Sequence, residues 1–425
     1  AIGAFGDDMA IAWADASTGE FGAGSFGRGD PERLRRELFR LSPREVLVRE
    51  STLDDGDVAR ALSERPSIVL NRFPDWTFSL EQGRAALLGH FGTSSMKGFG
   101  FDDGDPALAA AGALLEYLRD SVKARLSQFR ALGGCDDAEF VAIDESSQKN
   151  LEIERNLRDG GAAFSLYSVV NHTKTAMGAR ALRSRLQRPL RSAAAVNDRL
   201  DAVDALYRDQ RSLERVRAIL GSCRDLERLA SRLAMDRASP KDLVALRDTA
   251  RAALSVGSAL PAAAPATLSA LADPGDREAV AAFAEAIGRA VVDDPAMSPA
   301  DGAVIREGWS DELDGLRSLR ADAHGVLEAY LEEERRASGL SGLRVRYNKI
   351  IGYYLELSKG ADLSAPAHFI RRQSTTNTER FTTERLGRLE SDIHGAAERI
   401  VELERSLYAA LCGELKASAP LLFVT

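Results

Sequence analysis

Guanidinium, amide and hydroxyl side chains follow one another closely near the end of the chain. The run begins with Arg371 and Arg372, continues through Gln373, Ser374 and two threonines, and ends at Asn377. These residue types donate hydrogen bonds to phosphate oxygens, and arginine adds a planar, permanently charged fork. The run predicts contact with the backbone of a nucleic acid.

A second group of such residues lies in the stretch "LRVRYNKIIGYYLELSKG", residues 343 to 360. Apolar and polar residues alternate here as in a strand, and the alternation resumes after a break at residues 348 to 352. We therefore expect two strands with a tight connection. Arg346, Asn348 and Lys349 would lie on or beside this hairpin and extend the predicted phosphate-binding set.

Charge is unevenly distributed along the chain. The whole chain has a formal net charge of -8. Residues 341 to 388 hold nine Lys and Arg against four acids, a local charge of +5 that leaves -13 for the rest. Such asymmetry indicates a local contact with a polyanion.

Other chemistry has little support in the sequence. The five histidines show neither paired spacing nor an HExxH motif, and the three cysteines have no CxxC spacing. No GxxxxGK[ST] motif occurs, so no loop of the kind that holds a triphosphate is present. We predict no catalytic residue, no cofactor-binding residue and no metal site in this chain.

The elements that must position the basic residues are mostly helical. Residues 1 to 135 alternate strand and helix signals, with Asp30 as the N-cap of a helix, and predict a small α/β domain. Helical periodicity then dominates, apart from a loop expected at residues 256 to 275. Residues 312 to 336 and 386 to 415 are expected to be two long helices, an outgoing and a returning arm, with the strand-rich insert held between them.

At these motifs a resemblance becomes specific. The succession "RVRYNKIIGYYLELSKG", "APAHFIRRQSTTNTERFTTERLGRLE" and a long amphipathic helix closely resembles the clamp and returning lever of the MutS family of bacterial DNA mismatch-repair proteins. "LEIERNL", "TAMGARALRSRLQRPL" and "DLERLASRLA" look like the core domain of that family. "WADASTGEF" and "LFRLSPREVLV" look like its connector domain.

The resemblance implies a multidomain, mainly helical chain. We expect a ribonuclease H-like connector domain at residues 1–135, a discontinuous core and lever domain at 139–336 and 386–425, and a β-rich clamp at 337–385. By resemblance, Asn348 and Asn377 match clamp positions that contact the DNA backbone. The family's mismatch-reading and ATPase domains have no counterpart here, so we expect a middle fragment that is not itself an enzyme.

Partners also follow from the resemblance. They are double-stranded DNA, a MutL-type repair partner bound through the connector domain, and a second copy in the full-length protein. ATP and Mg would belong to the parent protein's ATPase domain. The composition, with no apolar run of membrane-spanning length, leads us to expect a cytoplasmic, nucleoid-associated protein that binds no membrane.

One alternative stays open. Ribonuclease H-type enzymes bring several carboxylates together on two metal ions, and Asp15, Glu20, Glu50 and Asp75 could form such a set in the first domain. Acids at strand ends are common, and we interpret these four as structural. The sequence also leaves open whether the parent protein reads mismatches or other DNA structures.

Overall fold

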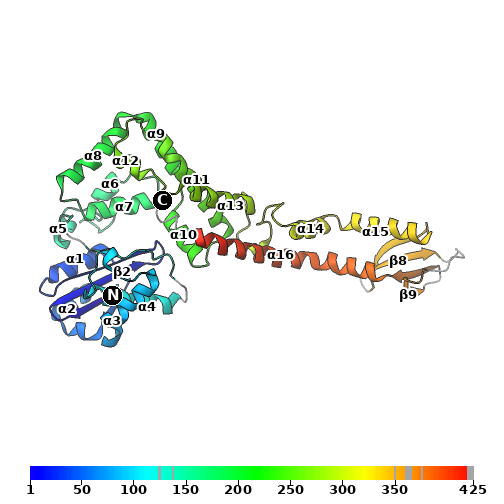
Figure 1. Cartoon of the computed structure of the whole chain (residues 1–425), viewed down its shortest axis with the longest axis horizontal. Helices are drawn as coiled ribbons and strands as arrows, with labels where there is room; N and C mark the ends of the chain where they lie inside the picture. The colour runs from blue at the N-terminus through cyan, green and yellow to red at the C-terminus, as the bar shows by residue number, and fades with distance from the viewer. Residues whose placement is uncertain (123–125, 136–137, 349–350, 359–365, 375–376, 419–425) are drawn as a thin grey trace. The chain divides into compact units, whose positions relative to one another are not determined.

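The computed structural model describes residues 1–122, 126–135, 138–348, 351–358, 366–374 and 377–418 (Figure 1). The contacts divide the chain into two compact units. One holds residues 1–238, 242–287 and the end of the last helix from residue 414, and the other holds 239–241 and 288–413. The prediction of a mainly helical, multidomain chain with a small α/β domain and a β-rich insert is confirmed. The boundaries proposed for the four segments stay predictions.

The first unit begins with a six-stranded mixed sheet of order β5-β4-β1-β2-β3-β6. Its strands are β1 (Ile2–Phe5), β2 (Asp8–Asp15), β3 (Glu20–Gly27), β4 (Glu45–Arg49), β5 (Val69–Phe73) and β6 (Gly133–Gly134). β1, β2 and β3 are antiparallel neighbours, whereas β4 and β5 run parallel to β1. β2 and β3 are joined by a turn in which Gly19 adopts a φ of 82°.

Helices cover both faces of this sheet. Because successive strand side chains point to opposite faces, Ile11 packs with Leu34 and Leu38 of α1 (Pro31–Leu41), and also with α2 (Gly56–Ser63). Ala10 and Ala12 instead meet α4 (Ala107–Val122), which lies beside α3 (Leu80–Phe91). The Asp30 carboxylate accepts the backbone N–H of Arg33 at 3.0 Å, so the predicted N-cap of α1 is confirmed. Short 3₁₀ turns cover Glu50–Asp54, Asp75–Phe78 and Lys97–Phe99.

The rest of the first unit is built from helices. They are α5 (Glu145–Asn150), α6 (Leu166–Val170), α7 (Ala176–Gln187), α8 (Ala193–Arg208), α9 (Gln210–Ser222), α10 (Leu226–Ala234), α11 (Pro240–Ala259), α12 (Ala266–Leu271) and α13 (Arg277–Ala290), of which α11 and α13 reach the unit boundary. The loop expected at residues 256 to 275 is wrong in part, because α11 continues to Ala259 and α12 lies within that range. The prolines do not oppose these helices, because Pro240 begins α11 and Pro265 precedes α12, and proline disrupts a helix only in its interior.

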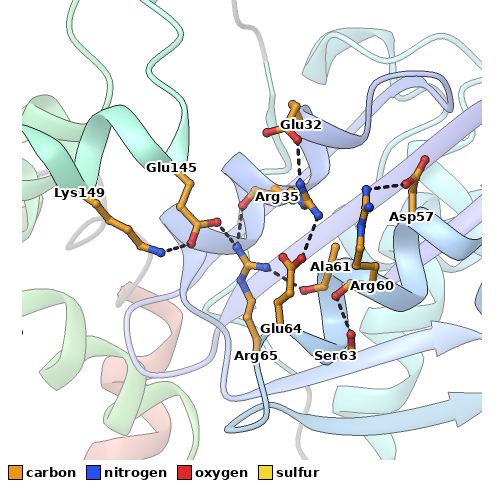
Figure 2. A network of polar contacts seen from close by, with 10 residues as sticks. All are labelled: Glu32, Arg35, Asp57, Arg60, Ala61, Ser63, Glu64, Arg65, Glu145 and Lys149. Carbon is orange, nitrogen blue, oxygen red and sulfur yellow. Dashed lines mark hydrogen bonds and ion pairs between the residues drawn. The ribbon is translucent and has the colours of Figure 1, made fainter.

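An ionic network connects the α/β part to α5 inside this unit (Figure 2). Arg65 donates to the carbonyl of Ala61 at 2.8 Å and to that of Arg35 at 3.3 Å, and it pairs with the carboxylate of Glu145. Lys149 pairs with the same carboxylate at 2.7 Å. Arg65 therefore connects three helices, because it donates to a carbonyl near the end of α2 and to one in α1 and also pairs with an acid in the first turn of α5.

The second unit contains α14 (Asp311–Ala321), α15 (Ala323–Ser338), most of α16 (Glu384–Ser418) and a short 3₁₀ turn at Pro299–Asp301. The outgoing arm is predicted as one helix, and this is wrong at Asp322. That residue leaves the helical conformation, with φ -124° and ψ 48°, and its side chain accepts the N–H of Gly325 at 2.9 Å. Aspartate gains more as an N-cap than inside a helix, so it ends α14 and starts α15.

A four-stranded antiparallel sheet of order β7-β8-β10-β9 lies between α15 and α16 in the sequence. Its strands are β7 (Arg344–Asn348), β8 (Gly352–Ser358), β9 (Ile370–Ser374) and β10 (Thr378–Thr382). β7 pairs with β8 from Arg344 opposite Glu356 to Asn348 opposite Gly352, so the predicted hairpin is confirmed. Among the described residues, no helix is long and apolar enough to cross a membrane.

Candidate nucleic-acid interface

One face of the four-stranded sheet is buried against the two arms. Leu355 and Phe381 lie opposite each other on β8 and β10 and pack with Leu327 and Tyr330 of α15 and with Leu386 of α16. The Tyr330 hydroxyl also lies 2.7 Å from the Thr383 hydroxyl oxygen, just before α16. Since side chains alternate along a strand, every second residue of each strand points to the opposite side of the sheet. We call this side the outer face; it carries Arg344, Arg346, Glu356, Arg380 and Gln373.

A row of charged residues crosses the outer face. Register places Arg344 opposite Glu356, Glu356 opposite Arg380, and Arg380 opposite Gln373. The Arg380 guanidinium donates to Gln373 at 2.8 Å and lies 3.6 Å from Glu356. It also covers the ring of Tyr354 at 4.7 Å, which leaves that tyrosine only 6% exposed. Arg380 is thus held in place before any ligand arrives.

Arg344 and Arg346 occupy the same face at the β7 edge. Both are exposed, and neither has an ion-pair partner among the residues that the structure describes. Among the described residues, Glu356 is the one acid between them and Arg380 on this face, and it pairs with Arg380. The outer face therefore carries more positive than negative charge, and Arg344 and Arg346 can donate to phosphate oxygens without breaking an internal pair.

The two arginines of the "RRQSTTN" run differ in their surroundings. The register of β9 and β10 shifts between Arg380 and Phe381, so Arg372 is the extra residue of a β-bulge. Arg371 lies opposite Phe381, on the side of the arms, and pairs with Glu379 of β10. Arg372 is exposed and has no such partner in the described part of the chain. Of these two arginines, only Arg372 can bind an anion without first breaking an ion pair.

The structure does not bring the predicted DNA-binding residues into one cluster. Arg346 and Asn348 lie on β7, and Arg371 and Arg372 on β9, so three strand spacings, about 14 Å, separate the two groups. Asn377 lies beyond the Ser374 end of β9, whereas Asn348 ends β7 opposite Gly352, at the other end of β8. The six residue steps of β8 separate those ends by about 20 Å. Lys349 lies outside the described residues.

One outer-face residue is absent from the predicted set. Arg344 shares its face with Arg346 and is as exposed, yet the prediction named only Arg346. The strand alternation of residues 343 to 348 already placed both arginines on one side and could have identified Arg344.

The nuclease alternative is not supported, because the four acids do not converge. Asp15 lies opposite Glu20 in the strand register, at one end of β2 and β3. Glu50 and Asp75 follow β4 and β5, near the opposite end of β2, since Arg49 donates to the carbonyl of Ala4. The seven strand steps of β2 span about 23 Å, too far for one two-metal site.

Three of these acids make structural contacts with neighbouring residues, namely Asp15, Glu20 and Asp75. Asp15 accepts Ser17 at 2.7 Å, and Glu20 accepts the Trp13 indole N–H at 3.0 Å. Hydrogen bonds from Ser51, together with Arg49 at 3.0 Å, lower the pKa of Asp75. Among the described residues, no group of three or more His, Cys, Asp or Glu could hold a metal ion.

Comparisons with known proteins match almost the whole chain. The family model for MutS domain II matches residues 1–130, and that for MutS domain III matches residues 146–424. The DNA mismatch repair protein MutS of Treponema denticola is 35% identical over 407 residues, which are 95% of this chain and 46% of that protein. Its counterpart in Treponema pallidum is 37% identical over 403 residues, 94% of this chain and 45% of that protein.

A further relative shows the same extent of similarity. The DNA mismatch repair protein MutS of Methanosarcina barkeri is 34% identical over 416 residues, 96% of this chain and 46% of that protein. The chain thus spans about half the length of the curated relatives that it matches.

Proposed function

The chain belongs to the MutS family, and from this premise we propose that its four-stranded sheet binds the phosphate backbone of duplex DNA in mismatch repair. The sheet acts as a clamp, and α14, α15 and α16 act as levers between the clamp and an ATPase domain of the full-length protein. The chain itself performs no catalysis.

The outer face carries this proposal. Arg344 and Arg346 are exposed there and unpaired within the described part of the chain, and Arg380 is fixed beside them by Tyr354 and Gln373. Arginine forks match phosphate geometry, and a pre-oriented guanidinium loses little freedom on binding. A flat row of arginines on one face of a small sheet suits a regularly charged backbone better than it suits a small anion.

Backbone contact predicts a particular kind of affinity. Phosphates carry no base information, so binding is independent of sequence and falls steeply with salt. For one copy of this chain we expect dissociation constants around 10⁻⁴ to 10⁻⁶ M at physiological salt. In the full-length homodimer two clamps would close over one duplex.

The lever role follows from the contacts of the arms. Arg317 of α14 pairs with Glu404 of α16 at 2.6 Å, and Glu333 of α15 pairs with Arg385 of α16 at 2.6 Å. These pairs hold the outgoing and returning helices together, so a displacement at one end of α16 is transmitted to the sheet.

Partners and cofactors of the whole protein are part of the proposal. ATP and Mg would bind in the ATPase domain of the full-length protein. A MutL-type partner would bind the α/β domain, residues 1–135. A protein that binds chromosomal DNA in this way would act in the cytoplasm, at the nucleoid.

The test compares salt dependence between matched variants. Arg344→Ala with Arg346→Ala should lower the slope of log affinity against log salt by about 0.9 for each lost phosphate contact. Arg199→Ala with Arg215→Ala removes two exposed charges from the helical part and serves as the control. Equal affinity and equal slope for the two double variants would contradict binding by the outer face.

A further inference from the structure

Glu390 lies on α16, the helix that follows the four-stranded sheet, and its charge is unfavourable for the function proposed above. The residue is half-buried, and no cation forms an ion pair with it among the residues that the structure describes. A carboxylate that is not neutralised repels phosphates. An acid beside a sheet that binds DNA therefore needs a reason in its contacts.

The first contact is a hydrogen bond to the backbone of β8. The Glu390 carboxylate accepts the N–H of Tyr353 at 3.2 Å. β10 pairs with β8 only from Ser358 to Leu355, so Tyr353 lies beyond the part of β8 that β10 covers. A strand N–H without a neighbouring strand needs another acceptor. Glu390, on the helix that follows β10, supplies it.

The second contact is with Gly352, the residue before Tyr353. Its φ of 75° lies in the left-handed region, which glycine adopts without strain. A Cβ at this position would overlap the Glu390 carboxylate, so the close approach also requires glycine. Asn348 lies opposite Gly352 in the register of β7 and β8. A contact that fixes Gly352 therefore fixes the backbone of Asn348 as well.

The next turn of α16 contacts the same end of the hairpin. The His394 ring is stacked with the Tyr347 ring, with their centroids 6.4 Å apart, and the Tyr347 and Tyr353 rings lie 5.0 Å apart. Glu390 and His394 are four residues apart, so they lie on one face of the helix. This face of α16 therefore holds both the backbone and the aromatic rings at the end of the hairpin.

We propose that Glu390 is a positioning residue for DNA binding. It acts as a hydrogen-bond acceptor that holds the end of the β7–β8 hairpin against α16, so that Asn348 meets the phosphate backbone in a fixed orientation. A segment that is already ordered loses less conformational freedom when it binds. This gain outweighs the repulsion between the carboxylate and the phosphates, because water and salt screen that repulsion.

The sign of the change in affinity separates this role from simple repulsion. Glu390→Ala removes both the charge and the acceptor, whereas Glu390→Gln removes the charge and keeps an acceptor oxygen. If Glu390 only repelled phosphates, both variants would bind DNA more tightly. If it positions the hairpin, Glu390→Ala should bind more weakly, and Glu390→Gln at least as tightly as the unsubstituted chain.

Fluorescence anisotropy titrations of the chain of residues 1–425 with duplex DNA, at several salt concentrations, test the proposal. Glu390→Ala should weaken binding by about threefold to tenfold and lower the salt slope by up to about 0.9. Glu398→Ala, which removes an exposed acid from the same helix, should not weaken binding. Circular dichroism of each variant verifies that the chain is folded.

A double-mutant cycle examines whether Glu390 acts through Asn348. Asn348→Ala should weaken binding in the unsubstituted chain and cause little further loss in Glu390→Ala. Hydrogen exchange provides a readout that does not depend on DNA. The amide of Tyr353 should exchange faster in Glu390→Ala than in the unsubstituted chain or in Glu390→Gln, because only the alanine variant lacks the acceptor.

The proposal rests on the proposed function, because it takes the sheet to bind DNA, but the two fail in different ways. Equal affinity of Glu390→Ala and Glu390→Gln, or full additivity of Glu390→Ala with Asn348→Ala, would overturn the positioning role. Failure of the proposed function would instead leave Arg344→Ala with Arg346→Ala at the affinity and salt slope of the unsubstituted chain, whereas the exchange of the Tyr353 amide would still respond to Glu390→Ala.

Discussion

Arg317 and Glu404 form an ion pair that joins α14 to the middle of α16, with the Arg317 guanidinium 2.6 Å from a carboxylate that is 0% exposed. The same carboxylate accepts the N–H groups of Ala303 at 3.1 Å and Val304 at 3.0 Å. Arg317 donates in addition to the carbonyl of Ile305 at 2.7 Å. One buried acid therefore organises the junction of three segments.

Removal of this acid should be costly. Glu404→Ala leaves a cation, the buried N–H of Val304 and the partly buried N–H of Ala303 without their acceptor, and breaking a buried pair on one side costs about 3–5 kcal/mol. The amides of Ala303 and Val304 should exchange with solvent much faster, which hydrogen exchange followed by NMR or mass spectrometry measures. Glu402→Ala, an exposed acid two residues away, should change the exchange little. Unchanged exchange at Val304 in Glu404→Ala would refute this role.

Arg371 should become available to DNA when its partner is neutralised. Glu379→Gln removes the carboxylate that now pairs with Arg371 and also reduces local repulsion of phosphates. Affinity for duplex DNA should rise at low salt, and the salt slope should increase by up to about 0.9. Fluorescence anisotropy titrations at several salt concentrations give both quantities.

The control for that variant is Glu384→Gln, which neutralises an exposed acid on α16 that pairs with Arg388. If the two variants bind DNA alike, Arg371 makes no phosphate contact.

Arg65 and Glu145 should be energetically coupled (Figure 2). Both side chains are largely shielded from water, so their pair is worth more than a surface ion pair, about 1–3 kcal/mol. Arg65→Ala and Glu145→Ala should each destabilise the first unit, and their double variant should be more stable than the sum predicts. Urea unfolding of the four proteins measures the coupling. Arg60 and Asp57, an exposed pair in the same region, should show little coupling in the same cycle.

Acid should weaken the link between α7 and α10. The Arg180 guanidinium donates to Asp225 at 2.7 Å through two nitrogens, and this contact lowers the pKa of Asp225. A lowered folded-state pKa stabilises the fold above the unfolded pKa of about 3.9, and the stabilisation is lost as pH falls through the folded value. The loss should therefore appear below about pH 4.

The check is the pH dependence of the melting temperature between pH 7 and pH 2. Arg180→Met should be less stable than the parent at neutral pH and should converge with it in acid. Arg185→Met, which removes an exposed arginine of the same helix, should follow the parent curve throughout. A constant difference between Arg180→Met and the parent across this range would contradict the assignment.

Local patterns determined most of the secondary structure. Alternation predicted the hairpin of β7 with β8, strand and helix signals predicted the α/β domain, and capping chemistry predicted the start of α1 at Asp30. These features depend on neighbours within a few residues, and such information is present in the sequence itself. The family and the class of candidate site followed from motifs of the same local kind.

What the tertiary structure decided is the arrangement of the candidate residues. The order β7-β8-β10-β9 places Arg346 and Arg372 on opposite edges, and the course of β2 separates Asp15 from Asp75. The pairing of Arg371 with Glu379, and of Arg317 with Glu404, depends on register and on the packing of α14 against α16. Strand order and helix packing arise from long-range burial of apolar surface, which no short window of sequence contains. The sequence therefore named the residues of the site, and the fold determined which of them can act together.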